Sequence, residues 1–151
     1  MKSDPRGFIQ EWHRLQRDSG SCVAACRAIV DARSGGEGEE TSGYPALEGE
    51  FLDPSLAENV DLLVARVRRH SSAIVTVDAS SWMVLARLRK MRSPYGDLDR
   101  GLHAIVIVAV DGVGKMLVAI DPYFPREFQP VNVSRDDFVA VWSGEVEFVE
   151  L

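Results

Sequence analysis

The stretch QRDSGSCVAAC, from Gln16 to Cys26, places two thiols four residues apart at the expected start of a helix. A buried helical cysteine is usually only a small apolar side chain. Cys22, however, stands at the helix N-terminus, where unpaired backbone N–H groups and the helix dipole favour an anion. This position favours the thiolate, which is the nucleophilic form. We therefore expect Cys22 to be a nucleophile and Cys26, one turn further along, to belong to the core.

His103 is the candidate base for this nucleophile. It begins the apolar run HAIVIVAV, which ends at Val110 and follows a loop that ends at Gly101. A polar residue at the rim of a buried strand is placed where loops expose reactive groups on a rigid scaffold. The alternative is a surface histidine at a strand end. His13 and His70 fit that alternative better, because both stand in polar stretches that are expected to be helical.

Asp121 is the candidate partner of the base. It ends the expected return strand KMLVAID, which follows the hairpin connection DGVG at 111–114. Antiparallel pairing brings the end of the second strand beside the start of the first. Asp121 is therefore expected to lie next to His103 and to orient its imidazole, although a plain Asp-Pro turn at a strand end is the common alternative.

Gln16 is the candidate oxyanion donor. It precedes Cys22 by six residues, and its amide could donate to a developing oxyanion together with the Cys22 backbone N–H. The alternative is a solvent-exposed helical glutamine. A zinc site built on Cys22, Cys26 and His103 is a weaker interpretation, because structural zinc takes four ligands, usually with cysteines in short knuckle spacing. We expect neither a metal nor another cofactor.

Hydrophobic periodicity predicts the elements that position these residues. Helices are expected at 5–16, 22–33, 53–67, 81–92 and 134–142, and strands at 73–79, 103–110, 115–121, 128–133 and 145–151. Ser21 and Ser134 are the expected N-caps of their helices. The segment 34–43 is expected to be a flexible acidic loop. Helices come first and an antiparallel sheet follows, which predicts one α+β domain over residues 1–151.

Composition limits the classes of partner. The chain has 151 residues and a net charge of −6, which argues against nucleic acid or an anionic membrane as the main partner. It has no apolar run long enough to span a membrane, and its start has no apolar core like that of a signal peptide. The chain is therefore expected to be cytoplasmic, with reduced thiols and a peptide or protein as its partner. Its oligomeric state stays open.

Taken in order, these residues resemble the papain-like cysteine peptidases, and most of all the bacteriocin-processing, double-glycine peptidase family. In that family a glutamine stands six residues before a nucleophile that opens a helix. A histidine begins an apolar strand, as in HAIVIVAVDG, and a hairpin leads to Asp-Pro, as in VAIDPY. The ending DFVAVWSGEVEFV also looks like the family's last helix and strand. The similarity covers nearly the whole chain, although residues 34–102 match only in outline.

The resemblance implies a papain-like fold, with N-terminal helices packed on an antiparallel sheet. It also implies a free-standing cysteine peptidase in which Cys22 attacks, His103 transfers protons, Asp121 orients His103, and Gln16 stabilises the oxyanion. The substrate need not be a double-glycine leader. Val23 departs from the glycine common after the nucleophile. Two alternatives stay open: the same triad used for deamidation, amidase or transglutaminase-like acyl transfer, and a binding module that has lost turnover.

Overall fold

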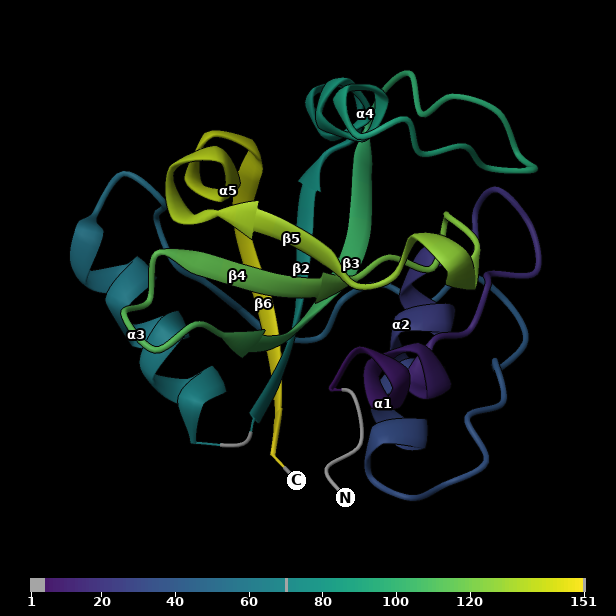
Figure 1. The fold of residues 1–151 in the computed structure, drawn as a ribbon, viewed down its shortest axis with the longest axis horizontal. Coiled ribbons are helices and arrows are strands. Elements are labelled where there is room, and N and C mark those ends of the chain that lie inside the picture. The colour runs from purple at the N-terminus through teal and green to yellow at the C-terminus, as the bar shows by residue number, and fades with distance from the viewer. Residues whose placement is uncertain (1–4, 70, 151) are drawn as a thin grey trace.

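The strands of this α+β chain form one antiparallel sheet with the order β1-β6-β2-β3-β4-β5 (Figure 1). The structure is a computed structural model and describes residues 5–69 and 71–150. The strands are β1 (Glu50–Phe51), β2 (Ser71–Asp78), β3 (Leu102–Val110), β4 (Met116–Ile120), β5 (Val131–Ser134) and β6 (Trp142–Glu150). The helices are α1 (Pro5–Trp12), α2 (Cys22–Arg33), α3 (Ala57–Arg68), α4 (Ala79–Leu88) and α5 (Arg135–Val141), with a 3-10 turn at Arg126–Phe128.

Helices cover both faces of the sheet, because the strands at its centre are apolar on both sides. In β3, Ala104, Val106 and Val108 pack in a core with α2, whereas Ile105 and Ile107 belong to the core beneath α3, α4 and α5. Figure 1 shows α1 and α2 on one side of the sheet and α3 on the other. The unbroken apolar run of β3 thus reflects burial on both faces.

The antiparallel sheet and the mixed composition predicted from the sequence are confirmed. The predicted order of helices and strands is also confirmed here, because β2 follows α3 and α4 lies between β2 and β3. The short edge strand β1, which pairs with β6, was not expected. Its two residues are both exposed, so they carry no periodic pattern that could reveal a strand.

The sheet opens where β4 leaves β3. Pairing between these strands runs from the hairpin to Val106 and Ile120 and stops short of His103. Beyond this point the carbonyl of Pro122 accepts a hydrogen bond of 2.8 Å from the backbone N–H of Gln16. The segment that leads into α2 therefore contacts the chain that continues from β4, which brings the N-terminus of α2 to the start of β3.

Tertiary contacts moved the ends of two predicted helices. The first ends at Trp12 instead of Gln16, because the residues that follow turn to bond the 121–125 segment. The helix expected at 81–92 runs over Ala79–Leu88, and the side chain of Asp78 accepts from the Ser81 N–H to cap it.

One of the two predicted N-caps is confirmed. Ser134 caps α5 as predicted, through a 3.1 Å bond from the Asp137 N–H. Ser21 precedes α2 but its side chain makes no capping bond. The 34–43 loop has no strand or helix, and Arg14 donates to the carbonyls of Glu37 and Gly38 within it.

Within residues 5–69 and 71–150, no helix is long and apolar enough to cross a membrane.

Candidate active site

Cys22 is the first residue of α2, and its side chain is partly exposed. The first-turn N–H groups of a helix have no acceptor within the helix. The hydroxyl of Ser21 does not cap this turn and instead contacts the backbone of Asp18. The thiol therefore stands at an N-terminus whose N–H groups are not taken by the usual capping side chain, which suits the binding of an anion.

The structure brings His103 and Asp121 together, as the hairpin predicted. His103 Nε2 and Asp121 Oδ1 are 2.7 Å apart, and both side chains are almost fully buried. A carboxylate only accepts, so Nε2 carries the hydrogen and Nδ1 is the ring nitrogen left for another partner. Cys22 is the candidate for that partner, because a hydrogen bond with the His103 side chain is among the causes that lower the pKa of the Cys22 thiol.

Contacts with His103 and the backbone favour the thiolate of Cys22. Burial raises the pKa of the Cys22 thiol, but the hydrogen bond and charge of His103, with a hydrogen bond from the Ala104 backbone, outweigh it and lower the pKa. Burial likewise opposes protonation of His103, but the charges and hydrogen bonds of Asp121 and Cys22 raise the pKa of His103 to about 10. Both shifts favour a thiolate beside an imidazolium, as in activated cysteine nucleophiles.

The Ala104 N–H is available to Cys22 because β3 has lost its neighbour there. The last residue pair between β3 and β4 is Val106–Ile120, so β4 supplies no acceptor at Ala104. A hydrogen bond from the Ala104 backbone is among the causes that lower the pKa of the Cys22 thiol. A backbone donor to the sulfur could not be read from side-chain types, and the sequence did not predict it.

Three donors converge on the carboxylate of Asp121. Oδ1 accepts from His103 and, at 2.9 Å, from the Tyr123 backbone N–H, while Oδ2 accepts from Trp82 Nε1 at 2.7 Å. The Tyr123 ring also lies edge-on to His103, with centroids 5.6 Å apart. Only a carboxylate, which accepts at both oxygens, satisfies this arrangement.

Trp82 falls within the helix expected at 81–92, and sequence reasoning missed its role in the site. One available signal was the pairing of β2 with β3, in which Asp78 lies opposite Leu102. A helix that begins at the end of β2 must then start at the same end of the sheet as His103. Trp82, in the first turn of α4, is therefore brought to the reactive group.

Gln129 and His13 hold the backbone on either side of Asp121. Gln129 Oε1 accepts from the Asp121 N–H at 2.8 Å, and its amide donates to the carbonyls of Asp121, Phe124 and Pro125. His13 Nε2 donates to the carbonyls of Asp121 and Phe124, at 3.2 and 2.8 Å. These bonds fix the carboxylate against the ring of the base.

The prediction that His13 lies at the surface was wrong. Its side chain is 2 % exposed, because it follows the end of α1 and bonds the segment beyond β4. Burial lowers its pKa, which keeps the ring neutral and its Nε2–H on the two carbonyls. His70 lies outside the described residues.

Gln16 is buried, and its described contacts do not include Cys22. Its side chain is 1 % exposed, so the alternative of an exposed helical glutamine was wrong. Its Nε2 donates to the Asp18 carbonyl at 2.7 Å, and Oε1 is buried with no hydrogen-bond partner in the described chain. The Tyr95 hydroxyl donates to its backbone carbonyl. Gln16 is therefore held rigidly, with one amide hydrogen left beyond its bond to Asp18.

The second thiol lies in the core. Cys26 is fully buried, and burial raises its pKa well above the usual value. Both thiols are free. In the described chain, no group of three or more His, Cys, Asp or Glu side chains is placed to hold a metal ion. Val23 is partly buried and packs against the core that contains Cys26.

Comparison of the chain with protein-family profiles, with curated proteins and with solved structures found no significant match. The likeness to double-glycine peptidases therefore stays a prediction from the sequence.

Proposed function

We propose that this chain is a cysteine peptidase of papain-like fold that cleaves a peptide or protein. The observation that carries the proposal is the 2.7 Å contact between His103 and Asp121, together with the influence of His103 that lowers the pKa of Cys22 and the raised pKa of His103. A buried acid, a base and a thiol in series form the arrangement that nucleophilic catalysis requires. The order of motifs along the chain supports the same assignment.

In this mechanism the Cys22 thiolate attacks the scissile carbonyl carbon. A sulfur–carbon bond forms, and the oxyanion is stabilised by N–H groups at the start of α2 and by the free amide hydrogen of Gln16. The carbon–nitrogen bond then breaks as His103 gives its proton to the departing amine. Water next attacks the thioester and gives a proton to His103, which releases the acid and restores the thiolate–imidazolium pair.

Asp121 and the groups around it keep His103 in the reactive orientation. The Nε2–H bond to Asp121 directs Nδ1 toward the sulfur, and the carboxylate stabilises the imidazolium. Trp82 and Tyr123 cover the pair, which strengthens the interaction by excluding water.

The test has two separate parts, which are alkylation of one sample with iodoacetamide and incubation of a second, unalkylated sample with a peptide library, each followed by mass spectrometry. We expect one reactive thiol, and cleaved products that disappear in Cys22→Ala but persist in Cys26→Ala. Peptides in which a side-chain amide has become an acid would indicate deamidation by the same thiol instead of peptidase activity. Cross-linked peptides would indicate acyl transfer by that thiol. A slowly labelled Cys22 and an unchanged library would favour the binding module, for which Val23 is the sequence argument.

A further inference from the structure

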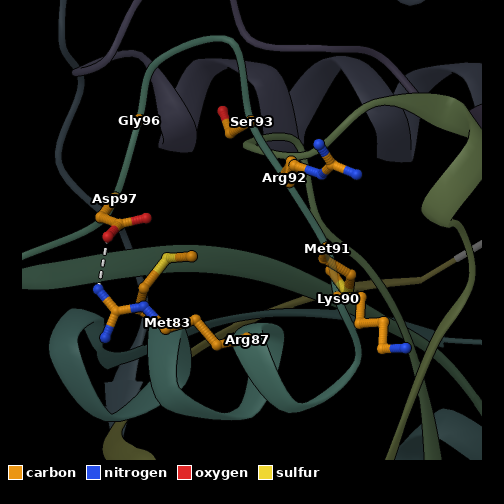
Figure 2. A pocket seen from close by; sticks show the side chains of 8 residues that line it. All are labelled: Met83, Arg87, Lys90, Met91, Arg92, Ser93, Gly96 and Asp97. Carbon is orange, nitrogen blue, oxygen red and sulfur yellow. Dashed lines mark hydrogen bonds and ion pairs between the residues drawn. The ribbon is translucent and has the colours of Figure 1, made fainter.

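A groove opens between α4 and the loop that follows it (Figure 2). It has a volume of about 560 Å³. Its lining residues are Met83, Arg87, Lys90, Met91, Arg92, Ser93, Gly96 and Asp97. This volume is within the range of small-molecule sites.

The groove joins an apolar floor to a basic rim. Met83 and Met91 are almost fully buried, and methionine adapts its shape to irregular apolar groups. Figure 2 shows Arg87 paired with Asp97 at one end and Lys90 and Arg92 at the other. The last two are exposed and have no acidic partner in the described chain.

This basic rim contrasts with the charge of the whole chain. The residues that line the groove include three basic side chains and one acidic side chain, although the net charge of the chain is −6. The Arg87–Asp97 pair is exposed on both sides, at 58 and 59 %, and an exposed pair contributes little to stability. Asp97 can therefore give way to an incoming carboxylate.

Lys90 is held in a backbone conformation that favours glycine. Its φ is 57°, and it stands just after α4 in a terminating motif in which the Met91 N–H donates to the Ala86 carbonyl and the Lys90 N–H to the Arg87 carbonyl. Glycine is the usual residue at this position, since any side chain is strained there.

The loop that forms the groove is bonded to the candidate active site. Ser93 Oγ donates to the Tyr123 carbonyl at 2.6 Å, and the Tyr123 ring contacts His103. Tyr95, two residues further along, donates its hydroxyl to the Gln16 carbonyl. A peptide in the groove would therefore lie beside the reactive residues.

From the methionine floor and the unpaired cations we infer that this groove binds the substrate through an acidic segment in which a carboxylate stands next to a large apolar side chain. The apolar group enters over Met83 and Met91, and the carboxylate pairs with Lys90 and Arg92. This inference deepens the proposed peptidase function and rests on it, because the bound peptide is a substrate only if the chain is a peptidase. Binding itself does not require turnover.

The test uses fluorescence anisotropy with the full chain carrying Cys22→Ala, which binds without cleaving. The probe is a short fluorescein-labelled peptide that alternates Glu and Leu, and its counterpart has Lys in place of Glu. We expect the acidic peptide to bind. Adding Lys90→Gly and Arg92→Gln should weaken its binding on the order of tenfold, since the two substitutions remove two exposed charge pairs with the peptide. Lys115→Gln, which removes an exposed cation from the β3–β4 hairpin, is the matched control.

Lys90→Gly should change stability and peptide affinity in opposite directions. Lys90→Gly removes strain and should raise the urea midpoint while weakening the acidic peptide, so lost affinity cannot be due to unfolding. Equal affinity in the Lys90→Gly and Arg92→Gln protein, or an equal loss in Lys115→Gln, would overturn the inference. So would tighter groove-dependent binding of the lysine peptide. Failure of Cys22 to react with iodoacetamide would remove the peptidase proposal and leave the binding result intact.

Discussion

Replacing Asp121 with asparagine tests the convergence of three donors on one side chain. Asparagine keeps the shape but has one accepting oxygen and one donating amide. In the wild type, Trp82 Nε1 donates to Asp121 Oδ2 at 2.7 Å. If the oxygen of the new asparagine stays with His103 and Tyr123, its amide faces Trp82 Nε1. Two buried donors then face each other without an acceptor.

The size of this effect follows from the bonds lost. A hydrogen bond to a charged group contributes about 1.5–3 kcal/mol, and a buried donor left unpaired costs about 1–3 kcal/mol. We expect Asp121→Asn to lower the free energy of unfolding by about 3 kcal/mol. Trp82→Phe removes the opposing donor. In that background Asp121→Asn should cost about 1–2 kcal/mol less, which is the coupling expected for residues in one network.

Urea unfolding followed by circular dichroism measures all four proteins of the cycle. Trp142→Phe is the matched control, because Trp142 Nε1 donates to the Glu145 carbonyl and shares no hydrogen-bond partner with Asp121. Its effect should add to that of Asp121→Asn. If the effects of Trp82→Phe and Asp121→Asn on the free energy of unfolding also add to within about 0.5 kcal/mol, Trp82 and Asp121 are not coupled. The proposed geometry around Asp121 is then wrong.

The remaining predictions concern the reacting residues. The rate of acyl transfer should show a bell-shaped pH profile. It should rise below the ordinary thiol pKa, because the pKa of Cys22 is lowered, and fall near pH 10 as His103 deprotonates. A rate that rises only above about pH 8.5 would contradict the thiolate–imidazolium pair. Folding raises the pKa of His103 from 6.5 to about 10. Protonation of His103 therefore stabilises the fold fully below about pH 6.5, and this contribution is lost as the pH rises to 10. Comparing the free energy of unfolding of the wild type and of His103→Ala across this pH range should reveal the loss. Peptide mapping after alkylation near neutral pH should find Cys22 modified well before Cys26, whose pKa is raised by burial, and the reverse order would exchange their roles. Gln16→Leu should slow acyl transfer on the order of 10²-fold and leave alkylation of Cys22 unchanged, since alkylation forms no oxyanion; equal loss of both reactions would assign Gln16 to folding alone.

The sequence by itself determined the parts of the site that depend on local pattern. Cys22 could be placed at a helix start because the apolar periodicity begins there, and α2 does begin at Cys22. His103 and Asp121 could be paired because a short hairpin connects their strands, so the register follows from the turn. Their 2.7 Å contact bears out that step.

Only the tertiary structure decided which other side chains surround that pair. Trp82 and Asp121 lie 39 residues apart in sequence, and His13 and Asp121 lie 108 apart. No local periodicity relates such positions, and each contact depends on how α4 and the end of α1 pack against the sheet. The burial of Gln16 was hidden for the same reason. The expected helix at 5–16 left an exposed amide open as the alternative for Gln16, whereas bonding to the segment beyond β4 ended the helix early and turned that residue inward.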